Sequence, residues 1–258
     1  MSLLDAQPAP ESALYKKQYE LQRKQMLSEK EAMLQYLPVP LGWDIRKQDN
    51  AKEMFEHANV KGFFVGAGIA LERPWARGTI HATSSDMHTH PAIDPRYLTN
   101  PVDLDILARS LLHGQNMFLT EPFSSKVKSA PDGTKVPMPG LKWVRTLEEA
   151  REAVKTSCLT QWRKFTLPFA NWMTITSPWL ILLPFHPADP VIDPIGTCAM
   201  LPQELGGVVD QGGKVYGTRG LRVCDASVFP IMPQGNLVSL VYATAEKISD
   251  AIKADNKQ

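Results

Sequence analysis

The sequence predicts an α+β fold in which an antiparallel sheet is flanked by helices, and three observations support this class. Helical and strand-like segments are mixed along the chain without the regular β-α alternation of a parallel sheet. Proline, with 21 residues, outnumbers glycine, with 16, which favours turns and irregular connections over a helical bundle. A length of 258 residues with 43% hydrophobic and 21% charged residues fits a globular protein of one large or two small domains.

The N-terminal part of the chain predicts a tail, a helix and two strands. Residues 1–10 carry two prolines and read as a loose tail. Apolar residues at helical spacing predict a helix over 11–37, which Pro38 ends. The β-prone stretches 59–71 and 78–83 predict strands.

Later in the chain, capping residues locate two helices, and a third ends the molecule. Asn100 precedes a proline and a run of leucines at helical spacing, so it opens a helix. Thr146 is a good N-cap, with two glutamates in the first turn of a helix predicted to run to about Ser157. A short strand over 221–223 and a terminal helix over 240–254 complete the prediction.

Charge and cysteine content exclude several classes of protein. The formal net charge is +1, so nothing in the composition favours nucleic acid or an anionic membrane as a partner. The three cysteines lack C-x-x-C spacing, so neither a zinc site nor a disulfide framework is predicted. The N-terminus has no apolar signal region, and the longest apolar run, 179–185, is too short to span a bilayer. We therefore expect a cytoplasmic protein.

One stretch imitates a dinucleotide-binding turn. Residues 65–70 (VGAGIA) follow two phenylalanines, as such a turn follows a strand. However, Leu71 occupies the third glycine position, and Pro74 falls where the phosphate-binding helix would run. A strand of small residues is therefore the favoured interpretation.

Histidines and cysteines are also better explained without a function. His88 and His90 alternate, with His81 nearby, so they could share one strand face and meet a metal ion. The segment is rich in turn residues and offers no third ligand at a clear spacing, so exposed loop histidines are favoured. Cys198 and Cys224 have no evident neighbouring base, and we expect them to be buried.

Three motif-bearing segments carry a family resemblance. The segment 73–98 contains RPWARGTI and PAIDPRYL, 194–210 contains PIGTCAM and GGVVD, and 215–247 contains VYG, LRVCDASVFP, PQGN and AEK. Together, in this order and spacing, they resemble the glucose-methanol-choline (GMC) oxidoreductases, which are FAD-dependent alcohol oxidases and dehydrogenases, and fungal members above all. The resemblance covers about 15–255, apart from the middle of 160–200.

The resemblance implies that only the C-terminal portion of such an enzyme is present. The family places its FAD-binding glycine-rich turn near the N-terminus of a longer chain, and that half has no counterpart here. After the tail, 11–205 resembles the substrate-binding domain and 206–258 the last segment of the FAD domain. An internal start at Met1 in a damaged or misassigned gene would explain this; a stand-alone domain whose partner chain supplies the flavin half is the alternative.

By resemblance, several residues face the flavin or the alcohol. Asp225, Ala226 and the residues from Asn236 through Leu237 to Val238 correspond to positions that approach FAD. Asn236 also corresponds to one of two residues that face the alcohol. The other is the histidine of a His-Pro-x-Gly-Thr motif, which takes the alcohol proton while hydride passes to the flavin. Here that position holds Asp193, which is shorter and, with an ordinary pKa of about 3.9, a weaker base at neutral pH.

An anomalous insertion, 163–193, separates Trp162 from Pro194. Arg163-Lys164-Phe165 can be encoded by CGT-AAG-TTT, which contains the splice donor GTAAGT, and Ile192-Asp193 by ATA-GAC, which contains the acceptor AG. Joining the flanking bases gives CAC, a histidine codon, in frame. We therefore expect a translated, unspliced intron. A real insertion that forms a loop over the substrate site is the alternative.

The resemblance thus predicts an FAD-dependent oxidoreductase that acts on the CH–OH group of a small-molecule alcohol, in fungal secondary metabolism. As this chain stands, we expect its activity to be impaired or incomplete. Two alternatives stay open. One is a non-redox lyase or cyclase of the same family; the other is a non-catalytic remnant or a subunit that needs a partner chain.

Overall fold

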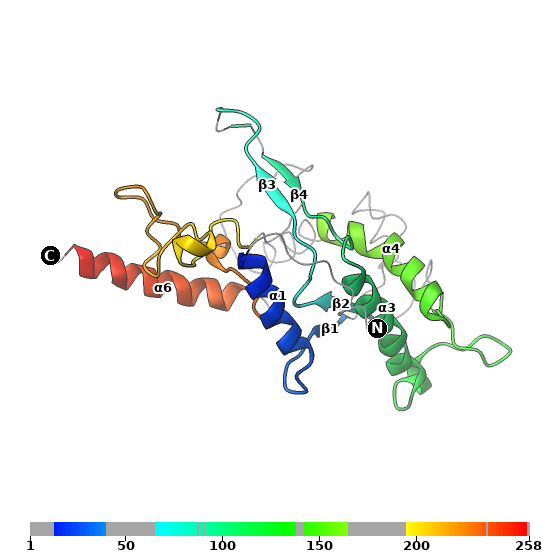
Figure 1. Cartoon of the computed structure of the whole chain (residues 1–258). Helices are drawn as coiled ribbons and strands as arrows, with labels where there is room; N and C mark the ends of the chain where they lie inside the picture. Colours follow the sequence, from blue (N-terminus) through cyan, green and yellow to red (C-terminus); the bar gives the residue numbers. More distant parts are fainter. Residues whose placement is uncertain are drawn as a thin grey trace. The chain divides into compact units, whose positions relative to one another are not determined.

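The computed structural model describes residues 13–39, 65–86, 88–89, 91–137, 142–164, 195–235 and 237–256 (Figure 1). The chain divides into two compact units. Unit 1 comprises Met1–Gln35, Leu71–Val102 and Asp193–Gln258, and unit 2 comprises Tyr36–Ala70 and Asp103–Ile192. Helices and small antiparallel strand pairs are mixed along the chain, so the predicted α+β class is confirmed.

The N-terminal helix is shorter than predicted. Helix α1 spans Ala13–Met26, and the chain then forms strand β1, Leu34–Val39, which pairs with β2, Gly66–Leu71. The prediction of helix up to residue 37 was therefore wrong. Pairing with a strand far along the chain outweighs the local helical periodicity, and Pro38 is tolerated in a two-stranded sheet because it lies at an edge.

Strands β3 (Thr79–His81) and β4 (Ala92–Asp94) form an antiparallel ribbon within unit 1 (Figure 1). Thr79 pairs with Asp94, and His81 pairs with Ala92. Gly78, which precedes β3, is required here because a Cβ atom would lie 2.4 Å from the carbonyl oxygen of Asp94. The strand predicted over 78–83 is thus confirmed in a shorter form, and the strand predicted over 59–71 is confirmed as β2, with 59–64 outside the described residues.

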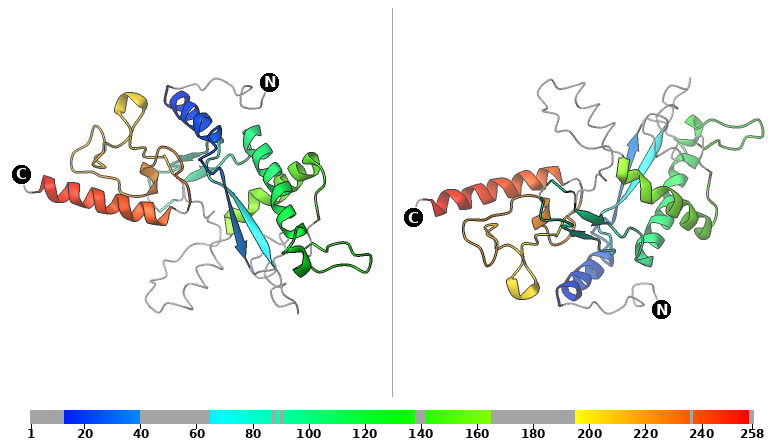
Figure 2. Two further views of the ribbon diagram at one scale, coloured as in Figure 1. Left: turned by 90° about the horizontal axis from the view of Figure 1, so that it is seen from below. Right: turned by 90° about the horizontal axis from the view of Figure 1, so that it is seen from above.

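The last part of unit 1 is a set of tight turns beside the terminal helix α6, Val238–Asp255, as both views of Figure 2 show. Val209, fully buried, bridges to both Met200 and Val215. The strand predicted over 221–223 is present only as a single bridge at Arg222, because turns on either side leave no room for a longer ladder. The terminal helix itself is confirmed.

Polar contacts fix the C-terminal end of α6. Lys214 lies 2.6 Å from the carboxylate of Asp255, and Arg222 also donates to it. The hydrogen bond from Lys214, reinforced by Arg222, holds the pKa of Asp255 below its ordinary value although partial burial opposes this. Ile248, buried on the inner face of α6, packs against Gly213 of the same turn region.

Two capped helices dominate unit 2. Helix α3 spans Pro101–Leu119, and the side chain of Asn100 accepts a hydrogen bond from the Val102 N–H at 2.9 Å. Helix α4 spans Leu147–Lys164, and Thr146 forms a capping box with Glu149: the Glu149 N–H donates to the threonine hydroxyl at 3.2 Å, and the Thr146 N–H donates to the carboxylate at 3.4 Å. Both predicted helix starts are confirmed, although α4 continues beyond Ser157.

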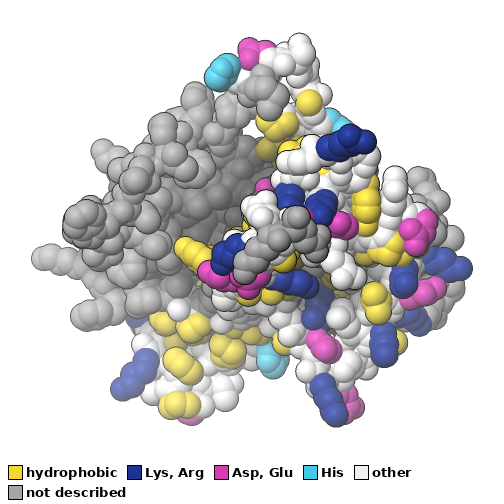
Figure 3. All heavy atoms as spheres, turned by 90° about the vertical axis from the view of Figure 1, so that its left-hand side faces the viewer, with side chains coloured by type: hydrophobic (Ala, Val, Ile, Leu, Met, Phe, Trp, Pro, Cys, Tyr) yellow, Lys and Arg dark blue, Asp and Glu magenta, His cyan; other side chains and the backbone are white. Residues whose placement is uncertain are grey.

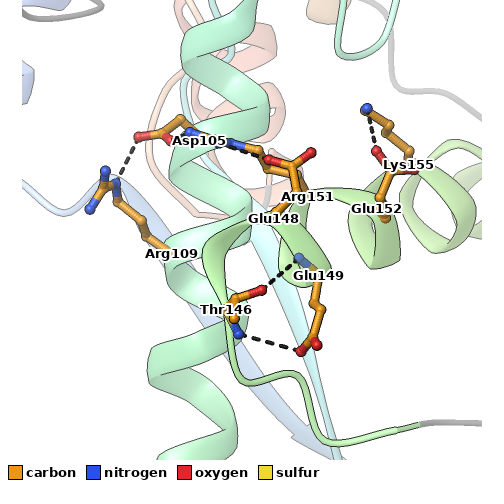
Figure 4. A network of polar contacts seen from close by, with 8 residues as sticks. All are labelled: Asp105, Arg109, Thr146, Glu148, Glu149, Arg151, Glu152 and Lys155. Carbon is orange, nitrogen blue, oxygen red and sulfur yellow. Dashed lines mark hydrogen bonds and ion pairs between the residues drawn. The ribbon is translucent and has the colours of Figure 1, made fainter.

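An ion-pair network joins α3 and α4 (Figure 4). The Asp105 carboxylate lies 2.7 Å from Arg109 and 2.7 Å from Arg151, and its side chain is 13% exposed. Ala108 on α3 and Ala150 on α4 are fully buried. Burial opposes ionisation of Asp105, but the hydrogen bonds from the two arginines outweigh it and hold its pKa below the ordinary value.

Replacing Asp105 by asparagine is expected to destabilise unit 2 by about 1–3 kcal/mol at pH 7, because two charge-assisted hydrogen bonds weaken. A carboxyl with a lowered folded-state pKa stabilises the fold above its unfolded-state pKa, and this contribution disappears as pH falls through the folded-state pKa. We therefore expect the difference in the free energy of unfolding between wild type and Asp105→Asn, measured with urea, to shrink as the pH is lowered from 7 to 3.

The matched control for this experiment is Glu152→Gln, which removes an exposed ion pair with Lys155 drawn in the same network (Figure 4). Because both side chains are largely exposed, we expect a change of less than about 0.5 kcal/mol at any pH. A difference between wild type and Asp105→Asn that stays constant down to pH 3 would contradict the assignment.

Candidate functional site

All three motif-bearing segments lie largely in unit 1, and two of them are hydrogen-bonded side by side. The Cys198 N–H donates to the Ser227 carbonyl at 3.0 Å, and the Met200 N–H donates to the Val228 carbonyl at 2.8 Å. Gly196 has φ of +80°, where a side chain would be strained and a Cβ atom would lie 3.3 Å from the Phe229 carbonyl oxygen. The PIGTCAM motif therefore lies along the DASVF stretch of the third segment.

The turn at Asp225 is built by its own side chain. The carboxylate accepts hydrogen bonds from the backbone N–H of Ser227 at 2.8 Å and from its hydroxyl at 2.5 Å, and so caps the 3₁₀ helix Ala226–Val228. Val228 is buried beneath the turn, whereas Asp225 is exposed and Ala226 is half-buried. The two residues predicted to approach FAD thus lie in a rigid turn that presents its outer side to solvent.

The loop that connects this turn to α6 is anchored along its length. The side-chain amide of Gln18, on α1, donates to the Pro230 carbonyl at 2.7 Å. The backbone N–H of Gly235 donates to the carboxylate of Glu72. Leu237 is buried, but Val238 at the first turn of α6 is 66% exposed. Leu237 and Val238 were both predicted to approach FAD, but Leu237 packs inward and Val238 faces solvent.

Two predicted site residues, Asp193 and Asn236, lie outside the described residues. Their described neighbours, Ile195 on one side and Gly235 and Leu237 on the other, belong to unit 1. The roles of Asp193 and Asn236 therefore stay predictions.

A cluster of polar residues contacts this loop, and the sequence did not predict it. Glu72 and Arg73 follow β2 directly and are each 7% exposed. Arg73 pairs with Glu31 at 3.0 Å, and the side chain of Gln234 donates to the same Glu31 carboxylate at 3.2 Å. The sequence offered one weak signal for these residues, because Glu72 and Arg73 stand between an apolar strand and Pro74-Trp75. Two charged residues at such a place are ordinarily expected in a solvent-exposed turn and not in a buried position.

The weaker motifs behave as expected in most respects. Residues 66–71 are a strand with no helix after it, so the interpretation that rejected a dinucleotide-binding turn is confirmed. His81, at the end of β3, and His88 are exposed, and His90 lies outside the described residues. Whether the histidine pair could meet a metal ion therefore stays untested, and the described residues hold no group of three or more potential ligands. The expected burial of Cys224 was wrong: it is exposed, because the segment around it forms a surface turn, and Cys198 is half-buried.

Two of the positions expected to approach FAD are open to solvent. Asp225 at the turn and Val238 at the start of α6 are both exposed. Among the described residues, no glycine-rich turn leads from a strand into a helix N-terminus, which is the usual diphosphate site.

Comparison with known proteins identifies the family. The sequence model of the GMC oxidoreductase C-terminal family, described as "GMC oxidoreductase", matches residues 74–167 and 185–245. The dehydrogenase mpl7 of Monascus purpureus is 33% identical over 70% of this chain and 23% of its own length. Glucose oxidase 1 of Penicillium expansum is 29% identical over 70% of this chain and 24% of its own length.

A solved structure of an FAD-dependent oxidoreductase from Chaetomium thermophilum superposes with a TM-score of 0.52 and 26% identity. It covers 74% of this chain, which in turn covers 27% of it. The chain thus spans about a quarter of the length of the curated relatives that it matches. Within the described residues, no helix combines the length and apolar character needed to cross a membrane.

The resemblance inferred from the three motif-bearing segments is therefore confirmed, and so is FAD as the cofactor of these relatives. The matched ranges include both hydrogen-bonded segments described above, 198–200 and 227–228. This protein belongs to the GMC oxidoreductase family.

Proposed function

We propose that this chain supplies the substrate-facing part of an FAD-dependent oxidoreductase that acts on the CH–OH group of a small alcohol. The observation that carries the proposal is the backbone pairing of residues 198–200 with 227–228. It holds the segment that follows Asp193 against the turn at Asp225, in the unit that also contains the loop before Asn236. This pairing supports the proposal because it joins the two segments to which the resemblance assigns contact with the substrate and with the flavin.

Each residue has a distinct chemical role in this proposal. Bound FAD would accept the hydride from the carbinol carbon. Asp193 would accept the hydroxyl proton, and the side-chain amide of Asn236 would donate a hydrogen bond that orients the alcohol oxygen. Because a carboxylate is a weaker base than imidazole at neutral pH and its charge opposes a developing alkoxide, we expect slow turnover.

A second polypeptide, or a separately encoded half, would supply the FAD-binding portion. Exposed apolar side chains on α6 support this, namely Val238 at 66%, Leu240 at 38% and Tyr242 at 72%. Apolar side chains are also visible on the face shown in Figure 3, which views the molecule from the side where α6 ends in Figure 1. Val238 and Tyr242 are one helical turn apart and so share one side of α6, where adjacent exposed apolar side chains are typical of an interface.

We further propose that residues 163–193 are encoded by an unspliced intron, so that the functional sequence joins Trp162 through histidine to Pro194. The gap between the two family-matched ranges, 168–184, supports an insertion within this stretch, although the matched ranges themselves reach to 167 and resume at 185. Histidine at the junction would restore the stronger proton acceptor. Sequencing genomic DNA and transcripts tests this: any bases other than GTAAGT at the proposed donor, or absence of a spliced transcript, would exclude it.

The visible spectrum of the purified protein, alone and after co-expression with the FAD-binding half of a fungal GMC oxidase, tests the proposed function. We expect a colourless chain alone, and flavin absorbance that is bleached by an alcohol in the co-expressed pair. Asp193→Asn should abolish the bleaching, whereas Asp193→His in a chain without 163–192 should accelerate it. A colourless chain that converts a substrate by itself would instead favour a non-redox lyase or cyclase.

A co-expressed pair that neither binds flavin nor converts an alcohol would favour a non-catalytic remnant. A role in fungal secondary metabolism and a cytoplasmic location are also part of the proposal, the first on the family resemblance and the second on the sequence. Deletion of the gene followed by metabolite profiling, and localisation of the tagged protein, would test them.

A further inference from the structure

We propose that Gln18, on α1, is a positioning residue that fixes the end of the turn 225–230, the segment to which the family resemblance assigns contact with FAD. The flavin-facing role of this turn rests on the proposed function, but its anchoring by α1 does not. The hydrogen bond from Gln18 to Pro230 joins residues 212 positions apart, both in unit 1, so it ties the N-terminal helix directly to the turn.

The buried side of α1 is polar, although apolar residues of the same helix are exposed. Gln18 is 6% exposed, and Gln22, four residues later on the same face, is 1% exposed. Tyr15 and Leu21 are 41% and 44% exposed. Burying two side-chain amides costs free energy unless hydrogen bonds offset it. This arrangement therefore indicates that specific polar contacts, and not apolar packing alone, hold α1 in place.

Gln22 fixes α1 to the turn that precedes β3. Its side-chain nitrogen donates to the Pro74 carbonyl at 3.1 Å, and its side-chain oxygen accepts from the Arg77 guanidinium at 2.8 Å. Arg77 also donates to the Pro74 carbonyl at 2.7 Å, so the three groups form a closed set of hydrogen bonds. Both ends of the Gln22 amide are thus satisfied, which fixes the helix about one turn away from Gln18.

Gln18 uses one end of its amide to hold the 225–230 turn. Its side-chain nitrogen donates to the Pro230 carbonyl at 2.7 Å, whereas its side-chain oxygen is buried without a hydrogen-bond partner among the described residues. An apolar side chain of similar length would avoid the cost of that oxygen. The bond to the turn, and not packing, therefore explains why a glutamine stands at this position.

The bond from Gln18 supports the turn where its other support ends. Residues 198–200 pair with the middle of the turn, and the Phe229 N–H donates to the Ala226 carbonyl at 3.2 Å. Pro230 follows directly and has no N–H, so its carbonyl is the backbone group through which the chain can be held there. Loss of the bond from Gln18 would free this end of the turn.

Amide exchange measured by nuclear magnetic resonance on the full chain tests the anchoring without any catalytic measurement. Gln18→Met keeps the length of the side chain but removes the donor. We expect exchange at Val228 and Phe229 to accelerate about tenfold, and the carbonyl carbon signal of Pro230 to shift. Gln18→Asn, whose amide is one methylene too short, should give the same result and provides the test if the methionine variant does not fold.

The matched control is Gln25→Met, the same substitution two helical turns along α1. The side-chain oxygen of Gln25 is likewise buried without a partner, and within the part of the chain that the structure describes no hydrogen bond joins Gln25 to the turn. This variant should leave exchange at Val228 and Phe229 unchanged, and exchange near Ile248 in α6 should stay slow in every variant. Unchanged exchange in the turn of Gln18→Met, or equal acceleration near Ile248, would overturn the anchoring.

The flavin spectrum of the co-expressed pair separates positioning from a purely structural role. Gln18→Met should shift the absorption maximum of the bound flavin, whereas Gln25→Met should not, because only the first variant frees the turn. Accelerated exchange together with an unshifted flavin spectrum would overturn the positioning role. A pair that binds no flavin would contradict the proposed function instead, and exchange in the chain alone would still decide whether Gln18 anchors the turn.

Discussion

Replacing Gly207 by alanine is expected to unfold unit 1, with a loss of about 3 kcal/mol or more in the free energy of unfolding. A Cβ atom at this position would lie 1.9 Å from the carbonyl oxygen of Leu201 and 2.5 Å from its carbonyl carbon. Both are backbone atoms, so no side-chain rotation can relieve the clash. The turn would have to move, and with it the hydrogen bond from the Gly207 N–H to the Pro202 carbonyl at 3.1 Å.

Gly217→Ala is the matched control because Gly217 has φ of +73° but nothing within 4 Å of its potential Cβ atom. We expect a cost of about 1–2 kcal/mol there, from left-handed backbone strain alone. Urea unfolding monitored by amide exchange, in α6 for unit 1 and in α3 for unit 2, would separate the effects. If the two variants lose the same stability, the steric account of Gly207 is wrong.

Trp75→Ala is expected to cost about 3–5 kcal/mol, because it removes a large buried ring and leaves a cavity. Trp75 is 2% exposed, and its ring lies 5.0 Å from that of Tyr19 on α1 at an interplanar angle of 56°. It belongs to the same motif as Arg73, so the loss should also loosen the support of the loop before α6. Chemical denaturation followed by circular dichroism would measure it.

Two variants bracket this expectation. Trp75→Phe keeps an aromatic contact with Tyr19 and should lose less than the alanine variant. Tyr242→Ala removes an aromatic side chain that is 72% exposed on α6, and we expect a change within about 0.5 kcal/mol. A near-neutral Trp75→Ala would show that the ring does not belong to the core of unit 1.

Features whose causes are local could be predicted from the sequence. The starts of α3 and α4 depend on Asn100 and Thr146, whose side chains cap the helix within a few residues. The strand at 66–71 was likewise predicted, because Leu71 and Pro74 exclude the competing turn. In each case the deciding residues lie close together in the sequence, within one helical turn for the two caps and within one short segment for the strand.

Features that depend on distant partners could not be predicted. Residues 34–37 have helical periodicity but become a strand because β2 is available to pair with them. The contact of Glu72 with Gly235 joins residues 163 positions apart, and no local pattern marks it. The pairing of Cys198 with Ser227 follows from no spacing rule either. The family resemblance selected the right segments, but the hydrogen bonds between them came only from the structure.

The discontinuous make-up of unit 1 affects how this protein can be cut for experiments. Its three pieces alternate along the chain with those of unit 2, so shortening the polypeptide from either end removes part of unit 1. A library of nested truncations would therefore yield incomplete cores. Isolating this unit calls for joining 1–35, 71–102 and 193–258 through glycine-serine linkers. Such a gene would also omit 163–192, nearly all of the stretch proposed to be encoded by an intron.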